Sequence, residues 1–65
     1  MSKYDYDISK HIVTMNYPFA SLVMAALRQA DSKNERVLLK AFPEITDELI
    51  KRYNAPGGVL EGEEE

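Results

Sequence analysis

The clearest hydrophobic pattern in the chain follows a proline, at residues 18–30. Apolar side chains recur there at the spacing of one helix face, namely Phe19, Leu22, Val23, Ala26, Leu27 and Ala30. Ala20 and Met24 widen the apolar arc to about 200°, roughly twice what a helix covered on one side needs. Pro18 suits the first turn of a helix. The pattern therefore predicts a central helix over 18–30 that is contacted from two sides.

Two more helices are expected after this one. Ser32 and Glu35 have the spacing of a capping box, which predicts a helix from residue 32 to about residue 42. Its expected buried face is Val37, Leu38, Ala41 and Phe42. Pro43 ends that helix and can begin the next. The last helix is expected to bury one face, made of Ile45, Thr46, Leu49, Ile50 and Tyr53.

Charges and turn residues define the end of the last helix. Asp47–Lys51 and Glu48–Arg52 are acid-first pairs at i, i+4, each worth about 0.2–0.5 kcal/mol. Asn54 followed by the Pro-Gly-Gly of residues 56–58 is a stop signal.

The first residues alternate between apolar and polar side chains, with Tyr4, Tyr6 and Ile8 on one side. This period of two is typical of a strand. No second strand is predicted to pair with it, so residues 1–7 are expected to be an extended arm. The alternative is a strand that pairs with another chain. A helix capped by Asp7 or Ser9 is expected to follow and to run to about residue 15, with Ile8, Ile12 and Met15 on one face.

Together these patterns predict an all-α protein, a compact bundle of three to four short helices. Residues 1–54 form the expected bundle domain with its extended N-terminal arm. Residues 55–65 form a flexible, acidic tail that contains Pro and Gly. Phe19, Phe42 and Tyr53 fall on apolar faces and are expected in the core.

Composition excludes several classes of protein. The 65 residues are 45% hydrophobic, which is too much for a disordered chain, and they include no Cys. A disulfide, a Cys-based zinc site and a Cys nucleophile are therefore impossible. The longest apolar run is residues 22–27, far below the roughly 20 residues of a membrane span. Without the features of a signal peptide, the expected compartment is the cytoplasm.

The formal net charge of −3 is concentrated at the C-terminus. Four of the eleven acidic residues are Glu61, Glu63, Glu64 and Glu65, which leaves seven acids against eight bases in residues 1–60. The body is therefore nearly neutral, with a net charge of +1. A metal site at this acidic end is not favoured, because a flexible site binds divalent ions weakly. The acidic end is interpreted as a solvated tail.

Candidate catalytic chemistry is sparse. Asp7 lies four residues before His11, the only histidine, and on a helix this spacing could orient a general base. No nucleophile or Gly-rich oxyanion loop accompanies the pair, which favours an ordinary surface pair. The chain is therefore expected not to be an enzyme. No cofactor, metal site or small-molecule substrate is inferred from it.

The leading hypothesis is a small, non-catalytic protein-interaction or regulatory module that acts on a protein partner or on itself as an oligomer. Tyrosine is common in interfaces, and three tyrosines lie outside the strong periodic stripes. With two apolar residues after the double glycine, the candidate partner contacts are Tyr4, Tyr6, Tyr17, Val59 and Leu60.

The alternative is a small helix-turn-helix-like protein that binds nucleic acid. Lys33, Arg36 and Lys40 would project within about 60° of one another on the helix that follows a tight turn. Against this alternative stand the negative net charge, Glu35 beside the stripe and the shortage of side chains that read base edges. A solvated outer helix face explains the same stripe without a function.

Several short motifs carry a resemblance: Tyr17-Pro18-Phe19, Met24-Ala25-Ala26, Arg28-Gln29-Ala30-Asp31, Ala41-Phe42-Pro43-Glu44 and Arg52-Tyr53-Asn54-Ala55-Pro56-Gly57-Gly58. Over most of residues 16–58 the chain resembles short bacterial proteins of phage-like and conjugative elements. The resemblance implies a bacterial or phage origin and intracellular use. It implies no activity and assigns no residue a role.

Overall fold

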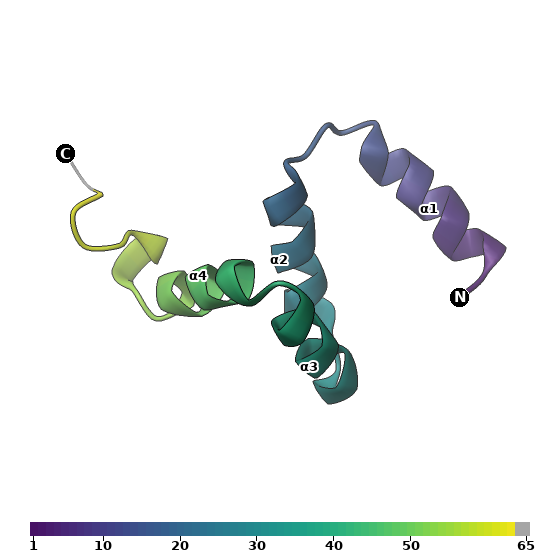
Figure 1. Cartoon of the computed structure of the whole chain (residues 1–65). Coiled ribbons are helices and arrows are strands. Elements are labelled where there is room, and N and C mark those ends of the chain that lie inside the picture. Colours follow the sequence, from purple (N-terminus) through teal and green to yellow (C-terminus); the bar gives the residue numbers. More distant parts are fainter. Residues whose placement is uncertain (64–65) are drawn as a thin grey trace.

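The computed structural model describes residues 1–63, and these residues are helical with no strand (Figure 1). The elements are α1 (Lys3–Val13), α2 (Phe19–Gln29), α3 (Ser32–Ala41), α4 (Pro43–Tyr53) and the short 3₁₀ helix η1 (Pro56–Gly58). The predicted all-α class is confirmed. No helix in this part of the chain has both the length and the apolar character needed to cross a membrane.

Helices α2, α3 and α4 pack against one another, and η1 packs on α4. Helix α2 is contacted by α3 and α4. Val23 and Leu27 on α2 are only 6% and 8% exposed, and Leu22 is half-buried. Ala26, which was also expected inside, is exposed. The buried side of α2 is therefore narrower than the arc that the sequence pattern outlines.

The junctions between these helices are formed by local side chains. Pro18 is the N-cap residue of α2, and the Asp31 carboxylate caps α3 by accepting a hydrogen bond from the Asn34 N–H at 2.8 Å. The cap thus lies one residue before the predicted Ser32. Phe42 lies between the two helices and is the C-cap residue of α3 and the N-cap residue of α4. Its carbonyl oxygen accepts a hydrogen bond from the buried Thr46 hydroxyl at 2.8 Å.

The prediction of an extended N-terminal arm is wrong, because the chain is helical from Lys3. The Ser2 hydroxyl oxygen accepts a hydrogen bond from the Asp5 N–H at 3.2 Å and caps the helix earlier than Asp7 or Ser9 would. The Lys3 ammonium and the Asp7 carboxylate then form an i, i+4 ion pair at 2.9 Å. These local interactions favour a helix over the strand-like alternation.

Two of the three aromatic side chains expected in the core are on the surface. Phe19 is 62% exposed and Tyr53 is 74% exposed, whereas Phe42 is half-buried. The edge of one ring meets the other in the Phe19–Phe42 pair, with centroids 5.6 Å apart. Three short helices enclose too little space to bury all the apolar faces that the sequence offers.

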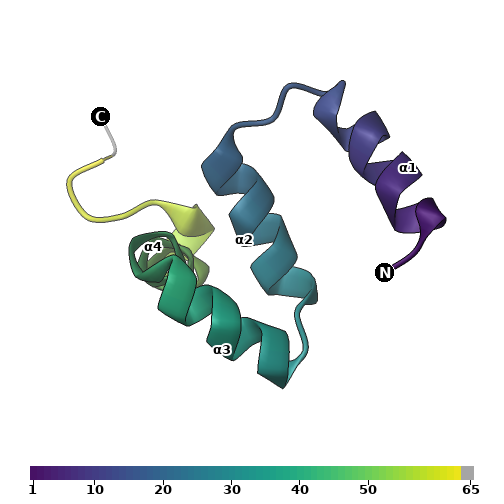
Figure 2. The same ribbon diagram turned by 45° about the vertical axis from the view of Figure 1, so that its right-hand side comes forward.

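Helix α1 stands apart from this group. Both views show α2 between α1 on one side and α3 and α4 on the other (Figures 1 and 2). No other element packs against α1. The radius of gyration is 13.9 Å, against about 11 Å for a compact chain of 65 residues. The difference reflects the separation of α1.

The segment after α4 folds back against that helix. The Arg52 guanidinium donates one hydrogen bond to the Gly58 carbonyl oxygen, at 2.7 Å, and two to the Glu63 carboxylate, at 2.7 and 2.5 Å. The Leu60 N–H also donates to the Glu63 carboxylate, at 3.0 Å. Of the predicted tail, residues 56–63 are thus placed beside α4. Glu64 and Glu65 lie outside the described residues.

Candidate protein-interaction surface

One face of α1 is apolar and uncovered. Tyr4, Ile8 and Ile12 follow one another at intervals of four residues, and Met15 in the turn after the helix continues the row. We call these four residues the α1 stripe. All four side chains are exposed, at 72%, 40%, 37% and 47%. An amphipathic helix ordinarily buries such a face against the rest of its protein, which α1 does not do.

A second apolar feature begins where the stripe ends. A shallow groove of about 310 Å³ lies between the end of α1, the linker and the open side of α2. We call it the α1–α2 groove, and its lining residues are Ile12, Tyr17, Ser21, Leu22 and Ala25. Ile12 belongs to both features, so the α1 stripe and the groove form one continuous surface.

The groove lies on the side of α2 opposite its buried residues. At 100° per residue, Ser21 and Ala25 point about 120–160° away from Val23 and Leu27. Helices α3 and α4 cover the Val23–Leu27 side. The second side of α2, which the sequence predicted to be contacted, therefore has no covering element within residues 1–63.

The structure separates the five predicted partner contacts. Tyr4 lies in the α1 stripe and Tyr17 lines the groove. Tyr6 lies on the other side of α1, with the Lys10 ammonium 5.4 Å from its ring centroid. Val59 is exposed and Leu60 is half-buried, both in the segment that follows η1 beside α4. Only Tyr4 and Tyr17 therefore belong to one surface.

Sequence reasoning did not assign the most informative residues of this surface to partner contact. Ile8, Ile12 and Met15 were placed on one helix face but were not proposed as an interface. The signal was their i, i+4, i+7 spacing. This spacing cannot show whether another element covers the face, because the position of α1 relative to α2 depends on the direction of the linker.

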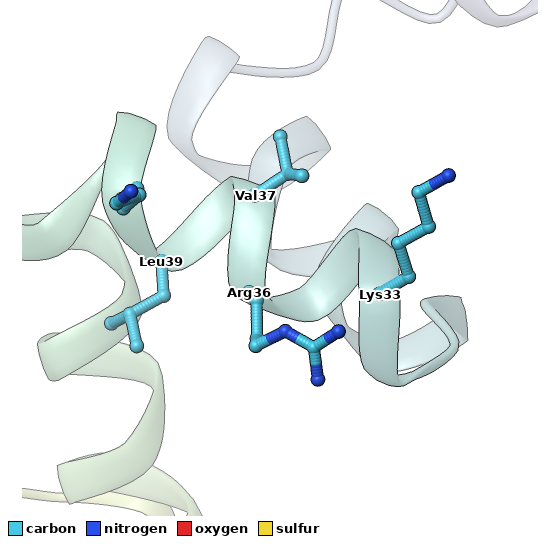
Figure 3. A pocket seen from close by; sticks show the side chains of 5 residues that line it. Lys33, Arg36, Val37 and Leu39 are labelled. Carbon is cyan, nitrogen blue, oxygen red and sulfur yellow. The ribbon is translucent and has the colours of Figure 1, made fainter.

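The three basic residues of the alternative hypothesis line another groove. Lys33, Arg36 and Lys40 share the outer face of α3 with Val37 and Leu39, around a hollow of about 460 Å³. In Figure 3 the nitrogen-bearing ends of Lys33 and Arg36 point away from the helix that carries them. None of the three forms an ion pair with a residue in 1–63. Their charges are available to an anionic partner.

The Asp7–His11 arrangement does not form an acid–base pair. The Asp7 carboxylate accepts a hydrogen bond from the Lys3 ammonium at 2.9 Å, four residues in the other direction. Within residues 1–63, no group of three or more His, Asp or Glu side chains is placed to hold a metal ion.

The strongest electrostatic interaction lies at the C-terminal end. The pKa of Glu63 falls to about 2, first because its carboxylate accepts hydrogen bonds from Arg52 and second because it accepts one from the Leu60 N–H. The same pairing, together with the Glu48 carboxylate, raises the pKa of Arg52 further above its ordinary value. This cluster holds the C-terminal segment against α4.

Comparison with protein-family models, with curated proteins and with solved structures found no match to this chain.

Proposed function

We propose that this chain is a small, non-catalytic protein-interaction module, belonging to a bacterial mobile element as its sequence resemblance implies. The observation that carries the proposal is the uncovered α1 stripe. An 11-residue helix packed against no other element presents three exposed apolar side chains in a row, and Met15 after the helix continues the row. Its binding surface is the α1 stripe with the α1–α2 groove.

The physical argument rests on the free energy of burial. Apolar surface removed from water contributes about 25 cal/mol per Å². An isolated helix shorter than about 12 residues is marginal in water, so α1 gains stability from anything that covers its stripe. Laying the apolar face of an amphipathic helix against a hydrophobic groove is a recurring mode of protein recognition.

Affinity capture with three matched baits tests this function. The baits are the tagged chain, its Ile8→Glu variant and its Val13→Glu variant, each exposed to a bacterial lysate and analysed by mass spectrometry. Val13 is exposed on the side of α1 away from the stripe, so it controls for adding a carboxylate to the same helix. Glutamate is a good helix former, so both variants keep α1.

We expect the parent and Val13→Glu to retain the same proteins, whether further copies of the chain or another protein. Ile8→Glu should lose them, because it places a charge in the middle of the stripe. Identical capture by all three baits would contradict the proposal.

Nucleic-acid binding through α3 is the second candidate. The observation in its favour is the group of Lys33, Arg36 and Lys40, free of ion pairs to residues 1–63, around one groove (Figure 3). Three phosphate contacts to duplex DNA predict a slope of about −3 in a plot of log affinity against log salt.

A titration with duplex DNA at low and moderate salt tests this candidate. Arg36→Glu should weaken binding, whereas Arg28→Glu, the same change in charge on α2 and outside this groove, should weaken it far less. No detectable binding near about 50 mM salt would exclude the candidate, since electrostatic binding is strongest at low salt.

A further inference from the structure

The exposed area of the chain indicates how much surface a partner would bury. The surface is 5749 Å², whereas a folded protein of this mass, 7.4 kDa, exposes about 4,200 Å². The excess is about 1,500 Å². Two copies that each buried this excess would hide roughly 3,000 Å² in total, which lies within the range of obligate homodimers. The excess thus matches an obligate interface better than a weak, transient contact.

We infer that a second copy of this chain covers the surface, with α1 of each copy inserted between α1 and α2 of the other. This inference rests on the proposed interaction function and names the partner. The resulting interface has two-fold symmetry, because each copy gives the same stripe and the same groove. Helices α1 and α2 of the two copies together form a four-helix bundle.

The dimensions of the two helices fit this arrangement. Both α1 and α2 have 11 residues and are therefore about 16 Å long. Ser21 and Ala25 in the floor of the groove are small and four residues apart. Small side chains at a helix contact permit the short interaxial distances of about 8 Å. The α1 stripe of the partner copy can thus lie along α2.

Charges beside the stripe fit an antiparallel pairing of the two α1 helices. Asp7 and His11 lie four residues apart on the same edge of the stripe. About a two-fold axis this edge meets itself, so Asp7 of each copy faces His11 of the other. Antiparallel helices also align their dipoles favourably. This complementarity is a property of two identical copies, and an unrelated partner would not share it.

The linker explains why the chain does not cover its own stripe. Asn16 adopts a left-handed backbone conformation with φ of 60°, and the proline ring fixes φ of residue 18 near −61°. With this linker geometry α1 is held away from α2, and of the α1 stripe only Ile12 lines the groove. The space between the two helices remains open to a helix from outside.

Sedimentation equilibrium of the untagged chain over a range of concentrations tests the inference. We expect twice the chain mass of 7.4 kDa for the parent and for Val13→Glu. Ile8→Glu and Ala25→Leu should each raise the dimer dissociation constant by at least about 100-fold, the first by burying a charge and the second by filling the groove. Neither change lies between α2, α3 and α4, so circular dichroism should show that these helices persist.

A charge-exchange experiment tests the antiparallel register. Asp7→Lys and His11→Asp should each weaken self-association, because like charges then face one another across the axis. A mixture of the two variants should form heterodimers at least about tenfold more tightly than either forms homodimers, since both cross-axis pairs then attract.

Three outcomes would overturn the inference: a monomer at every concentration, a dimer that Ile8→Glu leaves intact, or no preference for the mixed pair. A monomer whose α1-dependent capture of another protein persists would refute the second copy alone and leave the interaction function standing. If the chain is a monomer and the parent, Val13→Glu and Ile8→Glu baits all capture the same proteins, both the second copy and the interaction function are refuted.

Discussion

Arg52 is the side chain on which the position of the C-terminal segment depends. Its Nε donates to the Glu48 carboxylate at 2.9 Å, and its two terminal nitrogens reach Gly58 and Glu63. A planar guanidinium with five N–H donors can make these contacts at once, whereas a lysine ammonium cannot reproduce their geometry. One residue thus joins α4, η1 and the segment that follows.

The Arg52–Glu63 contact should depend on pH in a defined direction. Because the folded pKa of Glu63 is about 2 and its ordinary value is 4.5, the contact should be fully present above pH 4.5 and be lost as the pH falls through 2. Carbon-13 NMR of the Glu63 carboxyl carbon measures this titration. In Arg52→Lys the midpoint should move toward 4.5. A midpoint near 4.5 in the parent chain would show that the contact is not formed.

At the scale of elements, the sequence predicted α2, α3 and α4 to within about one residue at most of their ends. Strong signals coincide there: Pro18 and Pro43 begin helices, and the predicted ion pairs Asp47–Lys51 and Glu48–Arg52 form at 2.9 Å. These signals are local, so they can be read without knowing the tertiary structure.

The N-terminal element was mispredicted because Tyr4 and Ile8 satisfy two patterns. They belong to an alternation with a period of two and equally to a helix face at i, i+4. Ser2 as a cap decided the outcome in favour of a helix. The exposed positions of Phe19 and Tyr53 were beyond prediction for another reason, since apolar spacing shows which face a helix offers but not whether another element covers it.

Removal of the Ser2 cap should act on α1 alone. Ser2→Ala should destabilise this helix by about 1 kcal/mol, because the Asp5 N–H loses its acceptor. Since α1 packs against no other element, α2, α3 and α4 should keep their protection. Residue-resolved amide hydrogen exchange in dilute solution provides the measurement. Ser9→Ala serves as the control, because its hydroxyl bonds only to the Tyr6 carbonyl within the helix and Ala is the better helix former. Equal loss of protection in all four helices would refute this independence.

At the scale of the whole molecule, the core is small for the number of apolar residues. Among residues 1–63 only Val23, Leu27 and Thr46 are buried. A chain of this size is marginally stable without disulfides or metals, and association with a second copy is one established way to add buried area. Stability and self-association should therefore be linked in this protein.

This linkage makes the melting temperature depend on concentration. Between about 10 µM and about 1 mM protein, Tm should rise by roughly 5 °C or more, because mass action favours the folded dimer. The Ile8→Glu variant should show almost no rise. Thermal unfolding followed by circular dichroism at the two concentrations gives the comparison. If the Tm of the parent chain were the same at both concentrations, folding would not be linked to self-association.

The left-handed backbone at Asn16 has a consequence for how this protein can change. Two torsion positions, at Asn16 and Pro18, set the direction of α1, and no other element packs against it. One substitution in this joint would redirect the whole helix while leaving its sequence and its apolar row untouched. Related chains with identical helices but different joints would then present the same surface at different angles and so choose different assemblies.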